Sequence, residues 1–378
     1  MQKKNLTLPF LIGAVLFSGC TIDISQPAAE SATSTVVMPT LPATSTPAQN
    51  ASSNSAFPVE HVPVTWSNLI LTGKLIFTDA SMQDNNPQLE IQQLDLSNGD
   101  LTTIFQAPQL AWIYSVAVSP DGKQIVMSYS PPATVQSLFV LPVDGSQPPQ
   151  PLFQLPSKDD QYIQPTWSPD GRYLYFVHTN YALPPQEPNQ HYPIFEIYRM
   201  AYPGGQLEKL VDKAYWPRLS ADGSRMVYVS ENPQDGTNNL FLSNADGSNA
   251  SQVVLTGSGA PNIIDAPIFS PDGQSILFSA PVPVQSYKPS WLDRLLGVII
   301  ASAHSVPSEW WSVPLGGGAT TQLTHVQAPG LYASISADNQ HIASFSGYGI
   351  FVMNPDGTGL TTVLNDIGSI LGTVNWIP

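Results

Sequence analysis

The sequence feature that most constrains the fold is a turn followed by a strand, which recurs along most of the chain. In its clearest copy, residues 165–177 read PTWSPDGRYLYFV. Ser168, Pro169, Asp170 and Gly171 suit a tight turn, because Pro presets φ at the second position and Gly accepts a positive φ at the last. The flanking β-branched and aromatic residues are typical of strands. The unit therefore predicts a β-hairpin corner.

Six copies of this unit follow one another in the chain. Their turns are centred on Gly73, Gly122, Gly171, Gly223, Gly273 and Asn339, spaced 49 to 52 residues apart except for 66 before the last. After each copy come a second strand with a Gly-containing turn and a last apolar or Thr-rich strand, which makes four strands per unit. Four strands in about 50 residues is the size of a propeller blade. The sequence therefore predicts an all-β, six-bladed β-propeller with four-stranded blades.

The two ends of the repeat region complete each other. The first copy lacks the strand that precedes its turn, while residues 374–378, VNWIP, align with PTWSP at residues 165–169. We therefore expect the C-terminal strand to complete the first blade and to place Trp376 beside Phe77. Such closure removes the exposed sheet edges that favour aggregation.

The SPDG and SADG turns, followed by strands such as GRYLYFV, resemble the PD40 (WD40-like) repeats of TolB-like six-bladed propellers. The resemblance covers nearly everything after residue 62, with Asn339 in place of Gly in the last turn. Paired GH and WD dipeptides, the mark of WD40 propellers, do not occur. TolB also has a folded N-terminal domain, for which this chain has a low-complexity segment, so membership of a Tol complex does not carry over.

The N-terminus has the pattern of an export signal. Lys3 and Lys4 precede an apolar run at residues 6–17, which is too short to span a bilayer, and Ser18-Gly19-Cys20 follows. Residues 17–20 resemble the bacterial lipobox, although Phe17 departs from its usual aliphatic residue. The resemblance implies a signal peptide at residues 1–20, lipidation of Cys20 with fatty acids such as palmitate, and an extracytoplasmic protein anchored to a membrane, the outer one if the cell has two. The alternative is an uncleaved anchor with a buried thiol.

Composition separates the rest of the chain into two parts and excludes some classes of partner and bond. Residues 21–62 are rich in Ser, Thr, Ala and Pro, which predicts a flexible tether before a propeller at residues 63–378. A net charge of −15 excludes nucleic acid as a partner. Cys20 is the single cysteine, so no intrachain disulfide can form.

Two long insertions follow the second strands of their blades, at residues 180–193 and 281–309. Loops there share one face with the loops that enter the innermost strands, so we expect this rim to bind a partner, although neutral loop growth is the alternative. Within the second insertion, residues 290–304 predict a helix with a wide apolar surface. It either packs on the propeller, docks a partner, or enters a membrane interface through Trp291, Leu292, Leu295, Leu296 and Ile299.

The segments entering the innermost strands supply the candidate binding residues at the channel mouth. These are Trp112, Tyr114, Tyr162, Gln164, Tyr215, Trp216, Arg218, Asp265 and Tyr332. Aromatic groups with a few polar ones suit peptide or sugar recognition, but each aromatic residue has packing between blades as its alternative role. Arg218, the one basic residue of the set, either captures a carboxylate or pairs with a neighbouring Asp.

Catalytic motifs are missing from the sequence. It contains no HExxH, GxSxG, GxxxxGK[ST] or GxGxxG motif, and its histidines, His178 and His191 included, lack metal-ligand spacing. We therefore expect no cofactor, no metal and no enzyme, but a monomeric, membrane-tethered module that binds an envelope protein or peptide. The alternatives are a hydrolase or lyase acting on glycans at the channel mouth and a structural spacer in an envelope complex.

Overall fold

The computed structural model describes residues 59–83, 86–154, 158–181, 193–231, 238–281, 307–365, 367 and 372–378. These residues form strands and one short 3-10 helix, η1 (Trp66–Asn68). The predicted signal peptide, Cys20 and most of the tether lie outside the described residues. So does the predicted helix at 290–304, with Trp291, Leu292, Leu295, Leu296 and Ile299.

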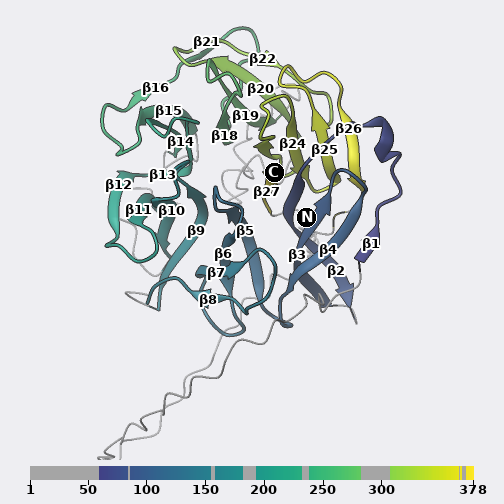
Figure 1. Ribbon diagram of the computed structural model, residues 1–378. Coiled ribbons are helices and arrows are strands. Elements are labelled where there is room, and N and C mark those ends of the chain that lie inside the picture. The colour runs from purple at the N-terminus through teal and green to yellow at the C-terminus, as the bar shows by residue number, and fades with distance from the viewer. Residues whose placement is uncertain are drawn as a thin grey trace, which may run out of the picture. The chain divides into compact units, whose positions relative to one another are not determined.

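The strands form six antiparallel sheets around a central axis, which confirms the predicted six-bladed propeller (Figure 1). The second blade contains β5 (Trp112–Val118), β6 (Gln124–Ser130), β7 (Ser137–Pro142) and β8 (Gln150–Pro151), and the third β9 (Asp160–Trp167), β10 (Tyr173–Asn180), β11 (Phe195–Ala201) and β12 (Glu208–Asp212). The fourth blade contains β13 (Ala214–Leu219), β14 (Arg225–Glu231), β15 (Asn238–Asn244) and β16 (Ser251–Gln252). In each blade the first of these strands is the innermost.

The fifth and sixth blades repeat this order. The fifth contains β18 (Asp265–Phe269), β19 (Ser275–Pro281), β20 (Ser308–Pro314) and β22 (Thr321–Gln322), and the sixth β23 (Tyr332–Ile335), β24 (Ile342–Ser346), β25 (Gly349–Met353) and β26 (Thr361–Asn365). A short parallel pair, β17 (Leu255–Thr256) and β21 (Gly318–Ala319), joins the segment after β16 to the segment before β22. The fourth and fifth blades are thereby linked at their outer parts.

The first blade is closed by the C-terminal strand. Its order is β1 (Val59–His61), β4 (Asp100–Gln106), β3 (Asn86–Asp95), β2 (Lys74–Gln83) and β27 (Val374–Ile377). The predicted closure is confirmed, but the expected register is two residues off, because Val374 and not Trp376 lies opposite Phe77, and Trp376 lies opposite Leu75. The predicted tether boundary at residue 62 is wrong, because β1 begins at Val59 and pairs with β4 as a fifth, outermost strand.

Hydrogen bonds from the C-terminal segment tie three blades together. The Trp376 indole N–H donates to the Thr72 carbonyl at 2.9 Å, and the Trp376 amide donates to Ser334 Oγ at 2.9 Å. On the other side, Thr373 Oγ1 donates to the Val116 carbonyl at 2.7 Å, and Asn375 Nδ2 donates to the same oxygen at 3.0 Å. The ring is therefore held closed by side chains as well as by the strand ladder.

The repeated turns share one hydrogen-bond pattern. In the third blade, Ser168 Oγ donates to Asp170 Oδ1 at 2.6 Å and accepts from the Tyr173 amide at 2.9 Å, while the Gly171 amide donates to the Ser168 carbonyl. The bond from Ser168, followed by bonds from Arg172, lowers the pKa of Asp170 to about 2. The same Ser-to-Asp bond occurs at Asp121, Asp222, Asp272 and Asp338. The recurring aspartates therefore have the structural role predicted for them.

Both faces of each middle strand are buried between neighbouring blades. In β10, Leu174 and Phe176 pack in a cluster with residues of the second blade, whereas Tyr175 and Val177 pack with residues of the fourth. This explains why the strands after the turns are continuously apolar instead of alternating.

Candidate functional site

The innermost strands β5, β9, β13, β18, β23 and β27 lie side by side around the axis and carry the candidate residues (Figure 1). Because they run in the same direction, residues at equal distance from their turn serines lie at similar depth. The turn side is the face with the Ser-x-Asp-Gly turns. The insert side is the opposite face, where β10 and β19 end and residues 182–192 and 282–306 continue.

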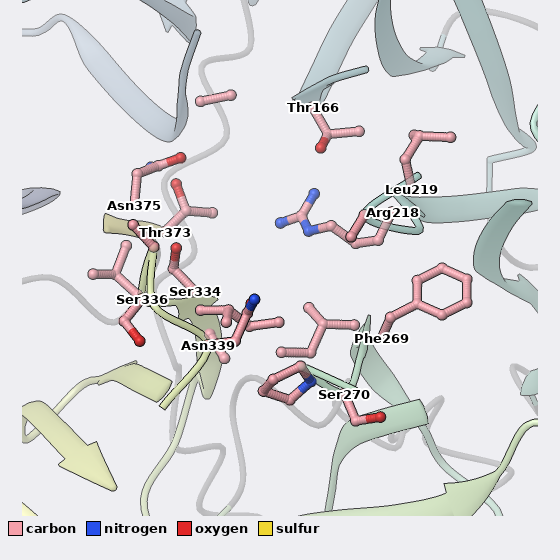
Figure 2. A pocket seen from close by; sticks show the side chains of 18 of the residues that line it. Thr166, Arg218, Leu219, Phe269, Ser270, Ser334, Ser336, Asn339, Thr373 and Asn375 are labelled. Atoms are coloured by element: carbon pink, nitrogen blue, oxygen red, sulfur yellow. The ribbon is translucent and has the colours of Figure 1, made fainter. Parts of the chain in front are cut away.

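A cavity of about 370 Å³ opens at the turn side. The residues two positions before the turn serines, and their equivalent in β27, line its wall: Ala117, Thr166, Arg218, Ile268, Ser334 and Asn375. Figure 2 shows the Arg218 guanidinium extending into this space, with Thr166 on the same side. Among the described lining residues, Arg218 is the one charged side chain.

Arg218 lies in an environment that does not neutralise it. Its Nη1 donates to the Pro217 carbonyl at 3.2 Å, and its guanidinium lies 5.8 Å from the Trp216 ring centre. It forms no ion pair with any carboxylate of the described residues. Burial lowers the pKa of Arg218 to about 10. Pairing with a neighbouring Asp, one of the two expectations for this residue, is therefore not found in the described part of the chain.

Aromatic side chains fill the channel beyond the cavity. The rings of Trp216 and Tyr332 lie 5.0 Å apart, and both residues are buried. Gln164 Oε1 accepts a hydrogen bond from the Trp216 amide at 2.8 Å, which joins the third and fourth blades. Burial, and then the charge of Asp265, raises the pKa of Tyr332 well above its usual value, while Arg218 acts against this shift. Tyr332 thus lies between the cavity and the insert side.

The backbone of this middle layer is strained in a regular way. Gln164, Trp216 and Ala266 precede Pro165, Pro217 and Pro267 at equivalent positions, and their φ angles are +53°, +55° and +43°. Non-glycine residues pay roughly 1–2 kcal/mol for this conformation. Register shifts in β13 and β18 span these residues. Bulges of this kind redirect side chains, and here they occur where the strands face the channel.

The insert-side mouth is aromatic and acidic. We define the mouth cluster as Trp112, Tyr114, Tyr181, Tyr215, Glu231 and Asp265. The rings of Trp112 and Tyr114 lie 6.4 Å apart, and Trp112 is 46% exposed while Tyr181 is 60% exposed. Although Tyr181 is largely exposed, its partial desolvation, and then the nearby Tyr114 and Glu231, raises its pKa. These side chains of the second, third and fourth blades therefore lie close together.

Two carboxylates lie within the mouth cluster. Burial, and then the charge of Asp265, raises the pKa of Glu231 to about 7. Asp265 is fully buried. Burial, and then the charges of Asp265 and Glu231, raises the pKa of Tyr215 well above its usual value. The Tyr215 hydroxyl accepts a hydrogen bond from Asn238 Nδ2 at 3.0 Å. At neutral pH the mouth therefore carries a carboxyl group that is easily protonated.

Tyr162 does not belong to either opening. It is 2% exposed, and its ring packs edge-on against Phe153 at 5.0 Å and Phe176 at 5.7 Å. Tyr162 therefore packs between blades, which is the alternative role expected from the sequence for the aromatic candidates. Strand alternation explains this, because neighbouring positions of β9 face the channel and the adjoining blade in turn.

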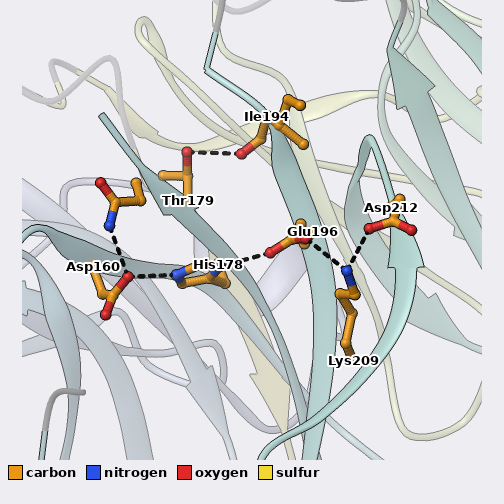
Figure 3. A network of polar contacts seen from close by, with 8 residues as sticks. Asp160, His178, Thr179, Ile194, Glu196, Lys209 and Asp212 are labelled. Atoms are coloured by element: carbon orange, nitrogen blue, oxygen red, sulfur yellow. Dashed lines mark hydrogen bonds and ion pairs between the residues drawn. The ribbon is translucent and has the colours of Figure 1, made fainter. Parts of the chain in front are cut away.

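A polar network crosses the third blade (Figure 3). His178 bonds through Nε2 to Asp160 Oδ1 and through Nδ1 to Glu196 Oε2, each at 2.9 Å. Lys209 Nζ donates to Glu196 at 3.0 Å and to Asp212 at 2.8 Å. The network links all four strands of the blade. His191, considered as a companion of His178, lies outside the described residues.

Three residues of the site were not singled out from the sequence: Thr166, Tyr181 and Glu231. Tyr181 and Glu231 occupy equivalent places, directly after or at the end of the second strand of a blade. The recurring X-Pro pair before the turns, at 164–165, 216–217 and 266–267, is the signal that marks the channel wall. Aligning the repeats on it would have identified Thr166 as the neighbour of Arg218.

No group of three or more His, Cys, Asp or Glu residues suited to a metal ion occurs among the described residues. In the same part of the chain, no helix has the length and apolar character needed to cross a membrane.

Comparisons with known proteins reveal the fold more clearly than the function. No family model matches the sequence. The uncharacterized protein Atu1656 of Agrobacterium fabrum is 28% identical over 130 residues, which cover 32% of this chain and 40% of that protein. The chain thus matches less than half the length of this curated relative.

Solved structures extend the likeness to the whole ring. A structure described as TolB from Agrobacterium tumefaciens has a TM-score of 0.50 at 15% identity, covering 82% of this chain and 99% of its own. TolB from Acinetobacter baumannii gives 0.54 at 16% identity, with 83% and 68% covered. A nidogen/laminin complex gives 0.54 at 10% identity, with 80% and 97% covered. The chain therefore has the fold of a TolB-like six-bladed β-propeller.

Proposed function

We propose that this protein is a binding module that holds a protein or peptide partner at the insert-side mouth of its channel. The observation that carries the proposal is the exposure of Trp112 and Tyr181 beside Tyr114. Most large apolar side chains of the described residues are buried, and an exposed Trp–Tyr group is typical of a protein-binding surface.

Other exposed apolar residues extend the same surface. Leu110, at 79% exposure, lies in the loop that enters β5, and Tyr348, at 57%, lies in the loop between β24 and β25. Both loops belong to the insert side by the connectivity of the blades. A patch of this kind provides apolar anchors around Glu231, which lies near the buried Asp265. The partner segment that fits it is apolar or aromatic and carries a Lys, an Arg or a free amino group.

Site-specific photocrosslinking in the source cells tests this proposal. We expect p-benzoylphenylalanine in place of Trp112 or Tyr181 to form the same adduct, because both positions face the partner. The matched control is Gln340, an exposed residue of a turn-side loop. No adduct from positions 112 and 181, or the same adduct from position 340, would contradict the proposal.

The charge of the mouth makes a second test of the same site. Because Glu231 has a pKa of about 7, it gains negative charge as the pH rises through 7. Recovery of the crosslinked partner should therefore increase between pH 6 and pH 8. Glu231→Gln should abolish this increase without changing the fold, and a pH response that survives in the variant would count against a cationic contact.

We further propose that the module is tethered to the outside of a bacterial membrane through lipidated Cys20. The support is the order of charge, apolar run and Ser18-Gly19-Cys20 in the sequence. Cys20→Ala should abolish incorporation of labelled palmitate and release the propeller from the membrane fraction. Cys20→Ser serves as the second variant, and fatty-acid labelling that persists in both would refute the anchor.

A glycan hydrolase or lyase is the second candidate, and the Glu231–Asp265 pair favours it. One carboxyl group with a raised pKa beside another charged carboxylate is the arrangement that acid–base catalysis on sugars uses. Incubation with a panel of neutral and acidic cell-wall glycans, followed by product chromatography, tests this function. Cleavage by the wild type that disappears in Glu231→Gln would support it, and absence of cleavage across the panel would leave the binding function.

A further inference from the structure

The turn-side cavity contains a charged group that has no counter-ion among the described residues. Arg218 takes part in no ion pair with the described residues, and the other described residues that line the cavity are all uncharged. Arg218 is partly buried, and a cation partly removed from water without a counter-ion is costly unless something else compensates it. Together with the strained layer behind it, this arrangement points to a ligand of opposite charge.

We propose that the turn-side cavity binds a single carboxylate group, carried on a small ligand or at a peptide C-terminus that has no other negative charge. This site is separate from the proposed partner surface, because it opens on the opposite side of the channel. The guanidinium offers paired N–H donors that match the two oxygens of a carboxylate.

Additional donors lie in the same cavity. No side-chain hydrogen bond joins the Thr166 hydroxyl to a described residue, and in Figure 2 Thr166 lies on the same side of the cavity as the Arg218 guanidinium. Asn339 also lines the cavity, on the side of Ser334 and Ser336. Other polar groups of the wall are already engaged, since Ser334 Oγ accepts from the Trp376 amide and Thr373 Oγ1 bonds to Val116. Arg218, Thr166 and Asn339 are therefore the groups available to a ligand.

The surroundings of the cavity limit the charge of that ligand. Its wall reaches the turns through Ala221, Pro271 and Ala337, each directly beside a turn aspartate in the sequence. The hydrogen bonds from the turn serines keep the pKa of Asp222, Asp272 and Asp338 below the usual range, so these groups are ionised at neutral pH. One partly buried cation within an acidic rim favours one negative charge and disfavours multivalent anions.

The size of the cavity agrees with a small ligand. Its 370 Å³ is near the lower end of the roughly 300–1,000 Å³ found for small-molecule sites. A short organic acid or the last two or three residues of a peptide fits this space, whereas a folded partner does not.

Defined probes test the site directly. Acetate, trialanine with a free carboxylate, trialanine amide and inorganic phosphate are titrated into the full chain and followed by NMR shifts or calorimetry. We expect trialanine to bind at least tenfold more tightly than its amide, because a hydrogen-bonded charge pair contributes that much. If acetate binds more weakly than trialanine, the cavity is a site for a peptide C-terminus. If acetate binds equally or more tightly, the cavity is a site for a free organic acid. Both results support a carboxylate site.

Matched variants connect binding to Arg218. Arg218→Gln should weaken trialanine binding at least tenfold, and Arg218→Lys should weaken it less. Arg172→Gln removes the same charge from an exposed turn on the same side and should leave binding unchanged. A Trp112→Ala/Tyr181→Ala variant should also bind trialanine normally, which separates this site from the proposed partner surface. Equal binding of the amide, undiminished binding by Arg218→Gln, or tighter binding of phosphate than of trialanine would overturn the proposal.

Discussion

At the scale of single residues, Arg218 predicts a conflict between stability and binding. Its pKa is lowered to about 10 by burial, so the folded protein holds the charge at a cost. Arg218→Met keeps an unbranched side chain of similar reach and removes the charge together with its contact to the Trp216 ring. We expect it to raise the free energy of unfolding by roughly 1–2 kcal/mol in the absence of ligand, as measured by urea denaturation. Arg172→Met, in an exposed ion pair, should change it little, and a destabilised Arg218→Met would mean that the guanidinium is structural.

The sequence predicts some residues of the site and not their grouping. Arg218 is identifiable because it is the one basic residue among the nine candidate residues at the channel mouth. Its unpaired state is not, since that depends on which neighbouring blades place carboxylates near it. Glu231 was missed for the same reason: its raised pKa comes from burial and from Asp265, which lies on another blade. Charge environments arise from contacts between repeats, which a pattern within one repeat does not contain.

At the scale of elements, the network across the third blade predicts a pH-dependent stability. Burial lowers the pKa of His178, but its bonds to Glu196 and Asp160 outweigh this, and the net pKa of His178 is raised. A histidine whose pKa is higher in the folded than in the unfolded state stabilises the fold fully at pH values below about 6.5. This stabilisation is lost as the pH rises through the folded-state pKa. The His178 bond, first among the causes, lowers the pKa of Glu196 to about 2, so its contribution is present above about pH 4.5. The network is strongest between these limits.

The measurement compares His178→Gln with the wild type by thermal melting. We expect a loss of about 1–2 kcal/mol near pH 5.5 and a smaller loss at pH 8.5, because raising the pH removes the imidazolium charge. His325→Gln, at an exposed histidine bonded to Gln322, is the control and should show the same small difference at both pH values. An effect of His178→Gln that does not change with pH would contradict the charged network.

Elements were predictable where local residues decide the backbone. Residues 168–173 contain every group of the turn, so the hydrogen bonds seen at Ser168 follow from that segment alone. The strand β1 was not predictable in this way. Val59–His61 lies in a segment of tether-like composition, and its strand conformation comes from pairing with β4. A three-residue edge strand has too short a pattern to be recognised without its partner.

At the scale of the whole molecule, the ring was predictable because six similar units must share one geometry. The same alignment shows that the first unit lacks a strand and that the C-terminus supplies it. The alignment does not show how the blades are joined. Thr373 and Asn375 bond to the second blade, whereas Trp376 bonds to the sixth and the first. Closure therefore depends on a few side chains at one junction.

Removal of residues 373–378 should therefore destabilise the entire propeller. The deletion exposes the edge of β2, opens the core around Trp376 and Val374, and breaks the bonds to Thr72, Val116 and Ser334. Loss of one buried Trp side chain costs roughly 3–5 kcal/mol, so the deletion should remove most of the 5–15 kcal/mol typical of a domain. We expect aggregation or a fall of more than 10 °C in melting temperature, with a smaller fall for Trp376→Ala. A synthetic peptide of residues 372–378, added in trans, should restore part of the loss, and a truncated chain that melts like the wild type would show that the ring does not depend on this strand.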